Sequence, residues 1–191
     1  KTTGRMVSIN EMLADGTYDA VTTQQASHFS GMPDTYALLP ELIGWVRDTQ
    51  PLAKVYLQET WAYEIDSTHG AFPQYHSDQR YMYECLRDAY RNAAKQVDAA
   101  LIPSGDVVQY FREHVTRYDY AHGGLSLNRD GFHLSIPYGR YLNSAVWFET
   151  LLGGDIRGNA FVPDGVQDVA LLAEIQNEAH NYLANDKKEA N

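Results

Sequence analysis

The sequence has a single cysteine, few basic side chains and no long apolar run. One cysteine, Cys85, excludes an internal disulfide, and its place on the apolar stripe of a predicted helix favours a core residue over a nucleophile. The 15 Lys and Arg are outnumbered by 25 Asp and Glu, which gives a formal net charge of −10. Because this surface repels phosphate backbones, nucleic acid is not an expected partner. No apolar stretch approaches the roughly 18 residues that a spanning helix needs, so we expect no membrane span.

Several catalytic and binding motifs are missing as well. No serine lies in the Gly-x-Ser-x-Gly turn that presents the nucleophile of many hydrolases. The glycine pairs at 123–124 and 153–154 lack the strand, the further glycines and the lysine of a phosphate-binding loop. No two histidines have the spacing of a zinc-binding helix, so we predict no metal and no cofactor. A metal-dependent hydrolase that uses His69, His76 and a nearby carboxylate remains an alternative.

What is present suits one globular domain with an alternating α/β pattern. The 191 residues are 44% hydrophobic, enough for a single core over 1–184 with a polar tail at 185–191. The patterns predict strands at 18–25, 54–59 and 100–103, and helices at 5–15, 34–48, 77–97, 106–115, 137–152 and from an Asp164 cap to 184. This alternation predicts an α/β fold with a parallel sheet. Three strands are few for that architecture, so we expect that strands preceding Lys1 are missing.

Polar residues follow each predicted strand, in the segments Gln24–His28, Glu59–Trp61 and Ser104–Asp106. Ligands of parallel α/β sheets bind beyond the carboxyl ends of the strands. We therefore expect a site where these three strand ends meet. Ser27 and Ser104 are candidate nucleophiles there, although serines in such loops commonly only cap helices.

The strongest catalytic candidate is the pair Asp130 and His133, separated by Gly131 and Phe132. In a turn, residues three apart lie on the same side. A carboxylate that accepts a hydrogen bond from one imidazole nitrogen fixes the tautomer and leaves the other nitrogen as a base for a serine. The more ordinary interpretation of an isolated pair is that Asp130 caps a helix and His133 is merely exposed.

Aromatic residues are concentrated after the second predicted strand. They are Trp61, Tyr63, Phe72, Tyr75, Tyr81 and Tyr83. Their faces suit stacking on sugar rings, which would make a carbohydrate pocket, but composition favours packing of a long loop onto the core.

Several segments in this order carry a family resemblance: Tyr18–Gly31, Gln58–Tyr63, Ile102–Gly105, and Arg129–Ser135 with Tyr138–Leu142. Their order and spacing resemble a poorly characterised, largely bacterial branch of the SGNH (GDSL-like) hydrolases, over about Tyr18–Phe161. The resemblance implies a flavodoxin-like three-layer α/β/α fold. It also implies ester hydrolysis by a Ser-His-Asp triad, often on acetylated or otherwise esterified carbohydrates.

The resemblance implies roles for particular residues. His133 would be the general base and Asp130 its orienting carboxylate. The segment with Gln24, Gln25 and Ser27 stands in place of the family's third block, so one of the two glutamines would serve the oxyanion hole.

By the same resemblance, Glu59 and Trp61 would shape the substrate pocket.

The family's nucleophile lies in a Gly-Asp-Ser or Gly-Asn-Ser turn after the first strand, and neither triplet occurs in this sequence. The glycine block of the oxyanion hole is not identifiable either.

The sequence therefore predicts an SGNH-like serine esterase that acts on an ester, with acetyl expected, of a carbohydrate or small molecule. The serine would be supplied upstream or by a second polypeptide that completes the sheet. The resemblance favours a secreted or periplasmic protein. The alternative is a non-catalytic carbohydrate-binding protein, or an inactive fragment, on the same fold.

Overall fold

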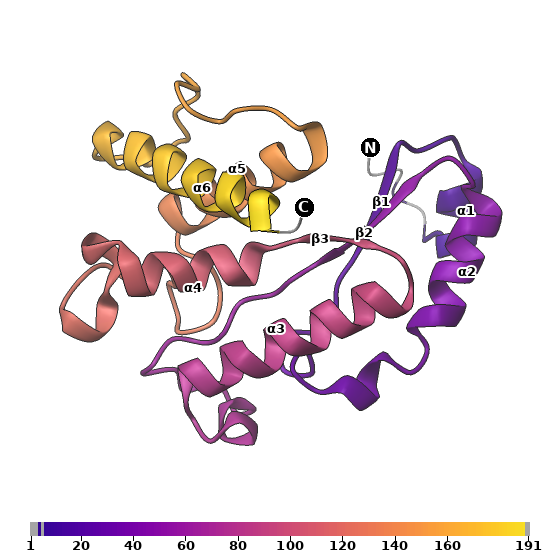
Figure 1. Cartoon of the computed structure of the whole chain (residues 1–191), viewed down its shortest axis with the longest axis horizontal. Coiled ribbons are helices and arrows are strands. Elements are labelled where there is room, and N and C mark those ends of the chain that lie inside the picture. The colour runs from indigo at the N-terminus through magenta and orange to yellow at the C-terminus, as the bar shows by residue number, and fades with distance from the viewer. Residues whose placement is uncertain (1–3, 5, 190–191) are drawn as a thin grey trace.

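The computed structural model describes residue 4 and residues 6–189. Its sheet has three parallel strands in the order β1-β2-β3 (Figure 1). They are β1 (Ala20–Thr23), β2 (Lys54–Gln58) and β3 (Ala100–Ile102). The predicted α/β fold with a parallel sheet is confirmed.

The α-helices of the described residues follow the predicted order, with several boundaries shifted. They are α1 (Ile9–Ala14), α2 (Leu39–Thr49), α3 (Gln79–Gln96), α4 (Ser104–His114), α5 (Tyr138–Leu152) and α6 (Val169–Glu189). Short 3-10 helices are η1 (Pro33–Tyr36), η2 (Phe72–Tyr75), η3 (Thr116–Tyr118) and η4 (Tyr120–His122). The predicted helix at 34–48 is thus two pieces, η1 and α2.

The predicted start and end of the last helix were wrong. Gly165 has a φ of +83°, so a helix that begins at Asp164 would be interrupted at once. The helix α6 begins at Val169 instead, where the Asp168 carboxylate accepts a hydrogen bond from the Ala170 N–H at 2.9 Å. The predicted tail at 185–191 continues α6 as far as Glu189, and residues 190–191 lie outside the described residues.

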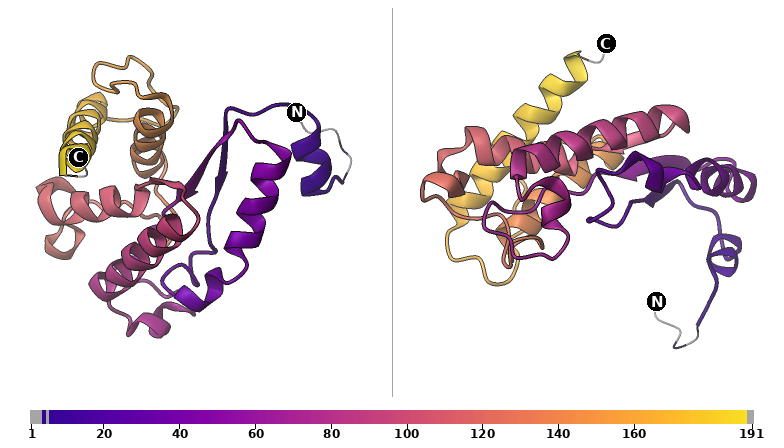
Figure 2. Two further views of the ribbon diagram at one scale, coloured as in Figure 1. Left: turned by 45° about the vertical axis from the view of Figure 1, so that its right-hand side comes forward. Right: turned by 90° about the horizontal axis from the view of Figure 1, so that it is seen from below.

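Alternate residues of β2 belong to two different cores, one on each face of the sheet. Val55 and Leu57 pack with α2 and α3, whereas Tyr56 packs with α4, α5 and α6. The left view of Figure 2 shows α2 on one side of the strands and α4, α5 and α6 on the other. The result is a layered α/β/α arrangement in which β2 is the central strand.

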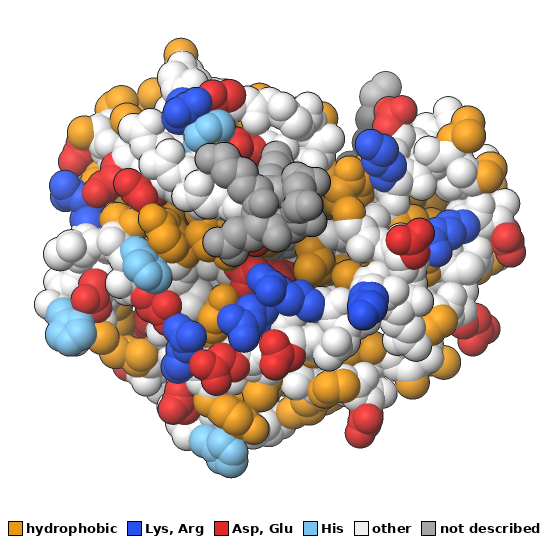
Figure 3. All heavy atoms as spheres, viewed as in Figure 1, with side chains coloured by type: hydrophobic (Ala, Val, Ile, Leu, Met, Phe, Trp, Pro, Cys, Tyr) orange, Lys and Arg blue, Asp and Glu red, His pale blue; other side chains and the backbone are white. Residues whose placement is uncertain are grey.

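The surface carries charges of both signs. Lys and Arg side chains are interspersed with Asp and Glu on the face shown in Figure 3. Among the described residues, none of the helices combines the length and apolar character that crossing a membrane requires.

Candidate active site

The Asp130–His133 segment forms a tight turn that closes on itself. The flanking residues Asn128 and Leu134 form an antiparallel bridge, and the Arg129 N–H donates to the His133 carbonyl at 2.9 Å. Gly131 has a φ of +84°, which side chains strongly disfavour, and its missing Cβ would lie 3.0 Å from a neighbouring backbone atom. The glycine is therefore what allows aspartate and histidine to share one side of this turn.

The two side chains are in direct contact. His133 Nδ1 lies 2.8 Å from Asp130 Oδ2, while Asp130 Oδ1 accepts the backbone N–H groups of His133 at 2.7 Å and Phe132 at 3.2 Å. Partial desolvation of Asp130 works to raise its pKa, but the hydrogen bonds from His133 and Phe132 outweigh it and lower this pKa to about 2. An ionised Asp130 can only accept, so Nδ1 carries the proton of a neutral His133.

This arrangement leaves Nε2 of His133 as the basic nitrogen. His133 is exposed, and no other side chain in the described part of the chain bonds to its ring. In particular, no serine, threonine or cysteine among the described residues contacts it through a hydrogen bond. The pair has the geometry of an oriented general base, and no proton donor lies within hydrogen-bond distance of its ring among the described residues.

Beneath the turn lies a buried ion pair. Arg112 in α4 and Glu64 have side chains that are 4% and 2% exposed, with Arg112 Nη2 3.6 Å from Glu64 Oε2. Arg112 also donates to Asn128 Oδ1 at 2.5 Å and to the Ala62 carbonyl at 3.0 Å. The Glu64 N–H donates to the Gly131 carbonyl at 2.7 Å. The pair thus supports the turn at Asn128 and at Gly131.

Sequence analysis missed this support. Burial lowers the pKa of Arg112 because it disfavours the charged guanidinium. The Glu64 carboxylate opposes this shift because it attracts that positive charge, as the partner in an ion pair does. Nothing in the local sequence marks either residue, because 48 positions of chain separate residues 64 and 112.

Two predicted site residues are connected to the turn. Trp61 Nε1 donates to the Phe132 carbonyl at 2.7 Å, which fixes the segment after β2 against the turn. Ser27 Oγ is hydrogen-bonded to the Tyr63 hydroxyl at 3.1 Å, and the Tyr63 and Phe132 rings lie edge to face at 6.0 Å. His69 packs against both rings, at 4.5 and 4.8 Å. These aromatic residues pack the long loop onto the core, the arrangement that composition favoured.

The side-chain amides of Gln24 and Gln25 differ in their hydrogen bonding. Gln25 Nε2 donates to the Thr35 carbonyl at 2.9 Å, and Gln25 Oε1 accepts from the Ala26 N–H at 2.8 Å. Gln24 is exposed, and its amide has no hydrogen-bond partner among the described residues. Its side chain lines a cavity of about 500 Å³ beside β1. Only Gln24 therefore has an amide that remains available to a ligand.

Glu59 and Ser104 lie below the surface. Glu59 is 2% exposed and its Oε2 accepts from the Asp106 N–H at 3.2 Å, at the start of α4. Burial and the Asp106 carboxylate raise the pKa of Glu59 well above its usual range. Ser104 is buried with its Oγ unpartnered in the described residues. A substrate contact through Glu59 stays a prediction, and Ser104 Oγ is not accessible to a substrate.

A second Asp-x-x-His pair also escaped the sequence analysis, although its spacing is visible there. His122 Nδ1 lies 2.8 Å from Asp119 Oδ2, at η4. Among the described residues, Trp61 forms its hydrogen bond to the turn of His133 and not to that of His122. The histidines of the alternative metal site, His69 and His76, belong to no cluster of three or more ligand-bearing side chains in the described residues.

Comparison with known proteins gives one family match and informative structural relatives. The model of a domain of unknown function, DUF4886, matches residues 1–181. A crystal structure of a DUF4886 family protein from Bacteroides uniformis is 34% identical, with a TM-score of 0.82. The match covers 93% of this chain and 66% of that one, so the chain spans just under two thirds of its relative.

A more distant structure shares the fold. A candidate SGNH hydrolase from Slackia heliotrinireducens is 20% identical with a TM-score of 0.53, over 74% of this chain and 70% of that one. At this identity the likeness shows the fold alone. No curated protein matches the chain.

Proposed function

The chain belongs to the DUF4886 family, and we propose that it is part of an SGNH-like serine esterase whose nucleophilic serine lies outside residues 1–191. The observation that carries the proposal is the 2.8 Å contact between His133 Nδ1 and Asp130 Oδ2, with Nε2 left free at the surface. An orienting carboxylate and a free imidazole nitrogen are two of the three members of a hydrolytic triad. The fold shared with the Slackia protein supports the same reaction class.

In the proposed mechanism, His133 Nε2 takes the proton of a serine hydroxyl as its oxygen attacks the acyl carbonyl. The imidazolium then gives that proton to the departing alkoxide, and an acyl-serine ester remains. Water, deprotonated by the same nitrogen, releases the acid and restores the serine. Asp130 stays ionised throughout and stabilises the imidazolium, which its depressed pKa favours.

The serine would come from strands that extend the sheet at β1. The outer edge of β1 has no strand beside it in the described residues, and the cavity next to it is lined by residues of β1 and α2. Leu38 in this lining is 74% exposed, an apolar surface that an added layer would cover. A third of the Bacteroides relative has no counterpart in this chain, which leaves room for such strands.

Gln24 is the glutamine that we assign to the oxyanion hole, because the Gln25 amide already serves Thr35. Its place in the cavity beside the β1 edge puts it next to where the serine strand would pair. One such donor contributes ~3 kcal/mol in comparable sites. The substrate that we propose is an acetyl ester of a carbohydrate or small molecule, met in the cell envelope or outside the cell.

The test is hydrolysis of 4-nitrophenyl acetate by the protein purified from the cells that produce it, with whatever polypeptide precedes or accompanies this chain. We expect His133→Ala to lower kcat by at least about 10³-fold. His122→Ala is the matched control, because it removes an equally close Asp-x-x-His pair and should leave the rate unchanged. Equal rates for His133→Ala and the unmodified protein would contradict the proposal. No turnover, with sugar binding that survives His133→Ala, would favour the binding-protein alternative.

A further inference from the structure

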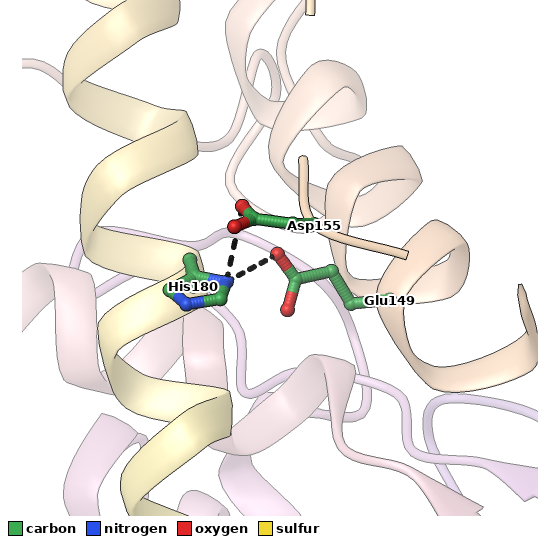
Figure 4. A group of neighbouring side chains, drawn as sticks. All are labelled: Glu149, Asp155 and His180. Atoms are coloured by element: carbon green, nitrogen blue, oxygen red, sulfur yellow. Dashed lines mark hydrogen bonds and ion pairs between the residues drawn. The ribbon is translucent and has the colours of Figure 1, made fainter. Parts of the chain in front are cut away.

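Three side chains that the proposed reaction does not use converge where α5 and α6 pack together. Glu149 comes from the last turn of α5, Asp155 from the loop that follows, and His180 from the middle of α6. Figure 4 shows all three pointing toward one another. His180 Nδ1 lies 2.9 Å from Glu149 Oε1 and 3.4 Å from Asp155 Oδ1, and one ligand-type atom from each residue lies within 4.8 Å of the others.

The buried carboxylate in this group requires a positive charge. Glu149 is 3% exposed, and among the described residues no Lys or Arg nitrogen lies within 4.0 Å of its oxygens. The Ile156 N–H donates to Glu149 Oε1 at 2.9 Å, which satisfies one lone pair but supplies no full charge. Buried carboxylates are paired with a cation or bind a metal. A metal ion held between Glu149 and its two neighbours would supply that charge at the buried carboxylate itself.

We propose that Glu149, Asp155 and His180 bind a divalent transition-metal ion of the zinc class. Zinc bonds of about 2.1 Å at tetrahedral angles place neighbouring ligand atoms about 3.4 Å apart. The separation of His180 Nδ1 from Asp155 Oδ1 matches this value, and the shorter separation from Glu149 Oε1 widens by about half an ångström when an ion replaces the proton between them. Calcium and magnesium fit less well, because they prefer oxygen ligands throughout.

Arg157 is compatible with this site. It forms hydrogen bonds to both carboxylate oxygens of Asp155, at 2.6 to 3.2 Å, and holds the pKa of that carboxyl well below its usual range. The Arg157 side chain is half-exposed and can turn into water as Asp155 Oδ1 takes the ion. The bound ion would link the end of α5, the loop and α6, with water as its fourth ligand.

The experiment is isothermal titration of the natively produced protein with ZnCl₂ after treatment with EDTA, with CaCl₂ and MgCl₂ as comparisons. We expect saturable one-to-one zinc binding, weakened at least 10-fold in His180→Gln and in Asp155→Asn. Asp155→Asn alters a half-exposed loop residue, so it tests the site even where His180→Gln unfolds the chain. His122→Gln is the matched control, since that imidazole faces only one carboxylate at a similar distance, and it should bind zinc as tightly as the unmodified chain.

Thermal unfolding gives a second readout. At a ZnCl₂ concentration of 100 times Kd, the Tm of a chain this size should rise by about 5–10 °C, and this rise should shrink in Asp155→Asn. Absence of one-to-one binding would overturn the proposal, as would equal affinity of Asp155→Asn and the unmodified chain.

Discussion

Replacing Arg112 with methionine should destabilise the protein strongly, because it leaves the Glu64 carboxylate buried without its cation. The two side chains are almost wholly excluded from water, and the same guanidinium donates to Asn128 Oδ1 and the Ala62 carbonyl. Removing one partner of a buried ion pair costs about 3–5 kcal/mol. For a chain of 191 residues this lowers Tm by about 6–20 °C.

Urea unfolding, followed by circular dichroism, measures this cost directly. The matched control is Arg117→Met, which breaks an ion pair with Glu174 whose side chains are 51% and 33% exposed. Exposed pairs contribute about 0–1 kcal/mol, so this variant should be nearly neutral. The double variant Arg112→Met/Glu64→Gln should recover part of the loss, because no buried charge is then left unpaired. A cost below 1 kcal/mol for Arg112→Met alone would refute the reasoning.

Three further predictions concern the turn itself. Gly131→Ala and its control Gly123→Ala both place a side chain at positive φ, but only the Cβ at 131 meets a backbone atom, at 3.0 Å. Gly131→Ala should therefore lower the free energy of unfolding in urea by about 1 kcal/mol more than Gly123→Ala does. Trp61→Phe removes the 2.7 Å hydrogen bond to the Phe132 carbonyl and should lower the free energy of unfolding by about 1–2 kcal/mol. Amide hydrogen exchange over residues 130–133 should become faster, and unchanged exchange would contradict this prediction. Asp130 has a folded pKa of about 2 against 3.8, so the stability from its ionised form is complete above about pH 4 and is lost as pH falls through 2. Its carboxyl carbon should titrate with a midpoint near pH 2 by NMR, and a midpoint near 3.8 would exclude these hydrogen bonds.

The sequence predicted those features that short stretches of chain determine. The apolar run within 54–59 predicted the strand β2, and the Asp-Gly-x-His spacing indicated a turn that unites Asp130 and His133. The predicted start of α6 was wrong because Asp164 and Asp168 are both residue types that cap helices. The positive φ of Gly165 prevents a helix from starting at Asp164, so Asp168 is the residue that caps α6.

Long-range contacts lay beyond the reach of the sequence. The Arg112–Glu64 pair supports the turn from two distant segments, and neither residue stands in a recognisable motif. Gln24 and Gln25 are adjacent and chemically equal, so only the fold separates them, by committing Gln25 to Thr35. The convergence of Glu149 and His180 depends on how α5 packs on α6, which no local pattern specifies.

The proposal that His133 serves a serine outside this chain is tested most directly by labelling with a fluorophosphonate, which reacts with activated serines. The natively produced protein would be labelled, digested and examined by mass spectrometry for the modified residue. We predict one labelled serine in a Gly-Asp-Ser or Gly-Asn-Ser turn outside residues 1–191, with labelling lost in His133→Ala and retained in His122→Ala. Labelling that is absent, that falls on Ser27, or that persists in His133→Ala would contradict the proposal.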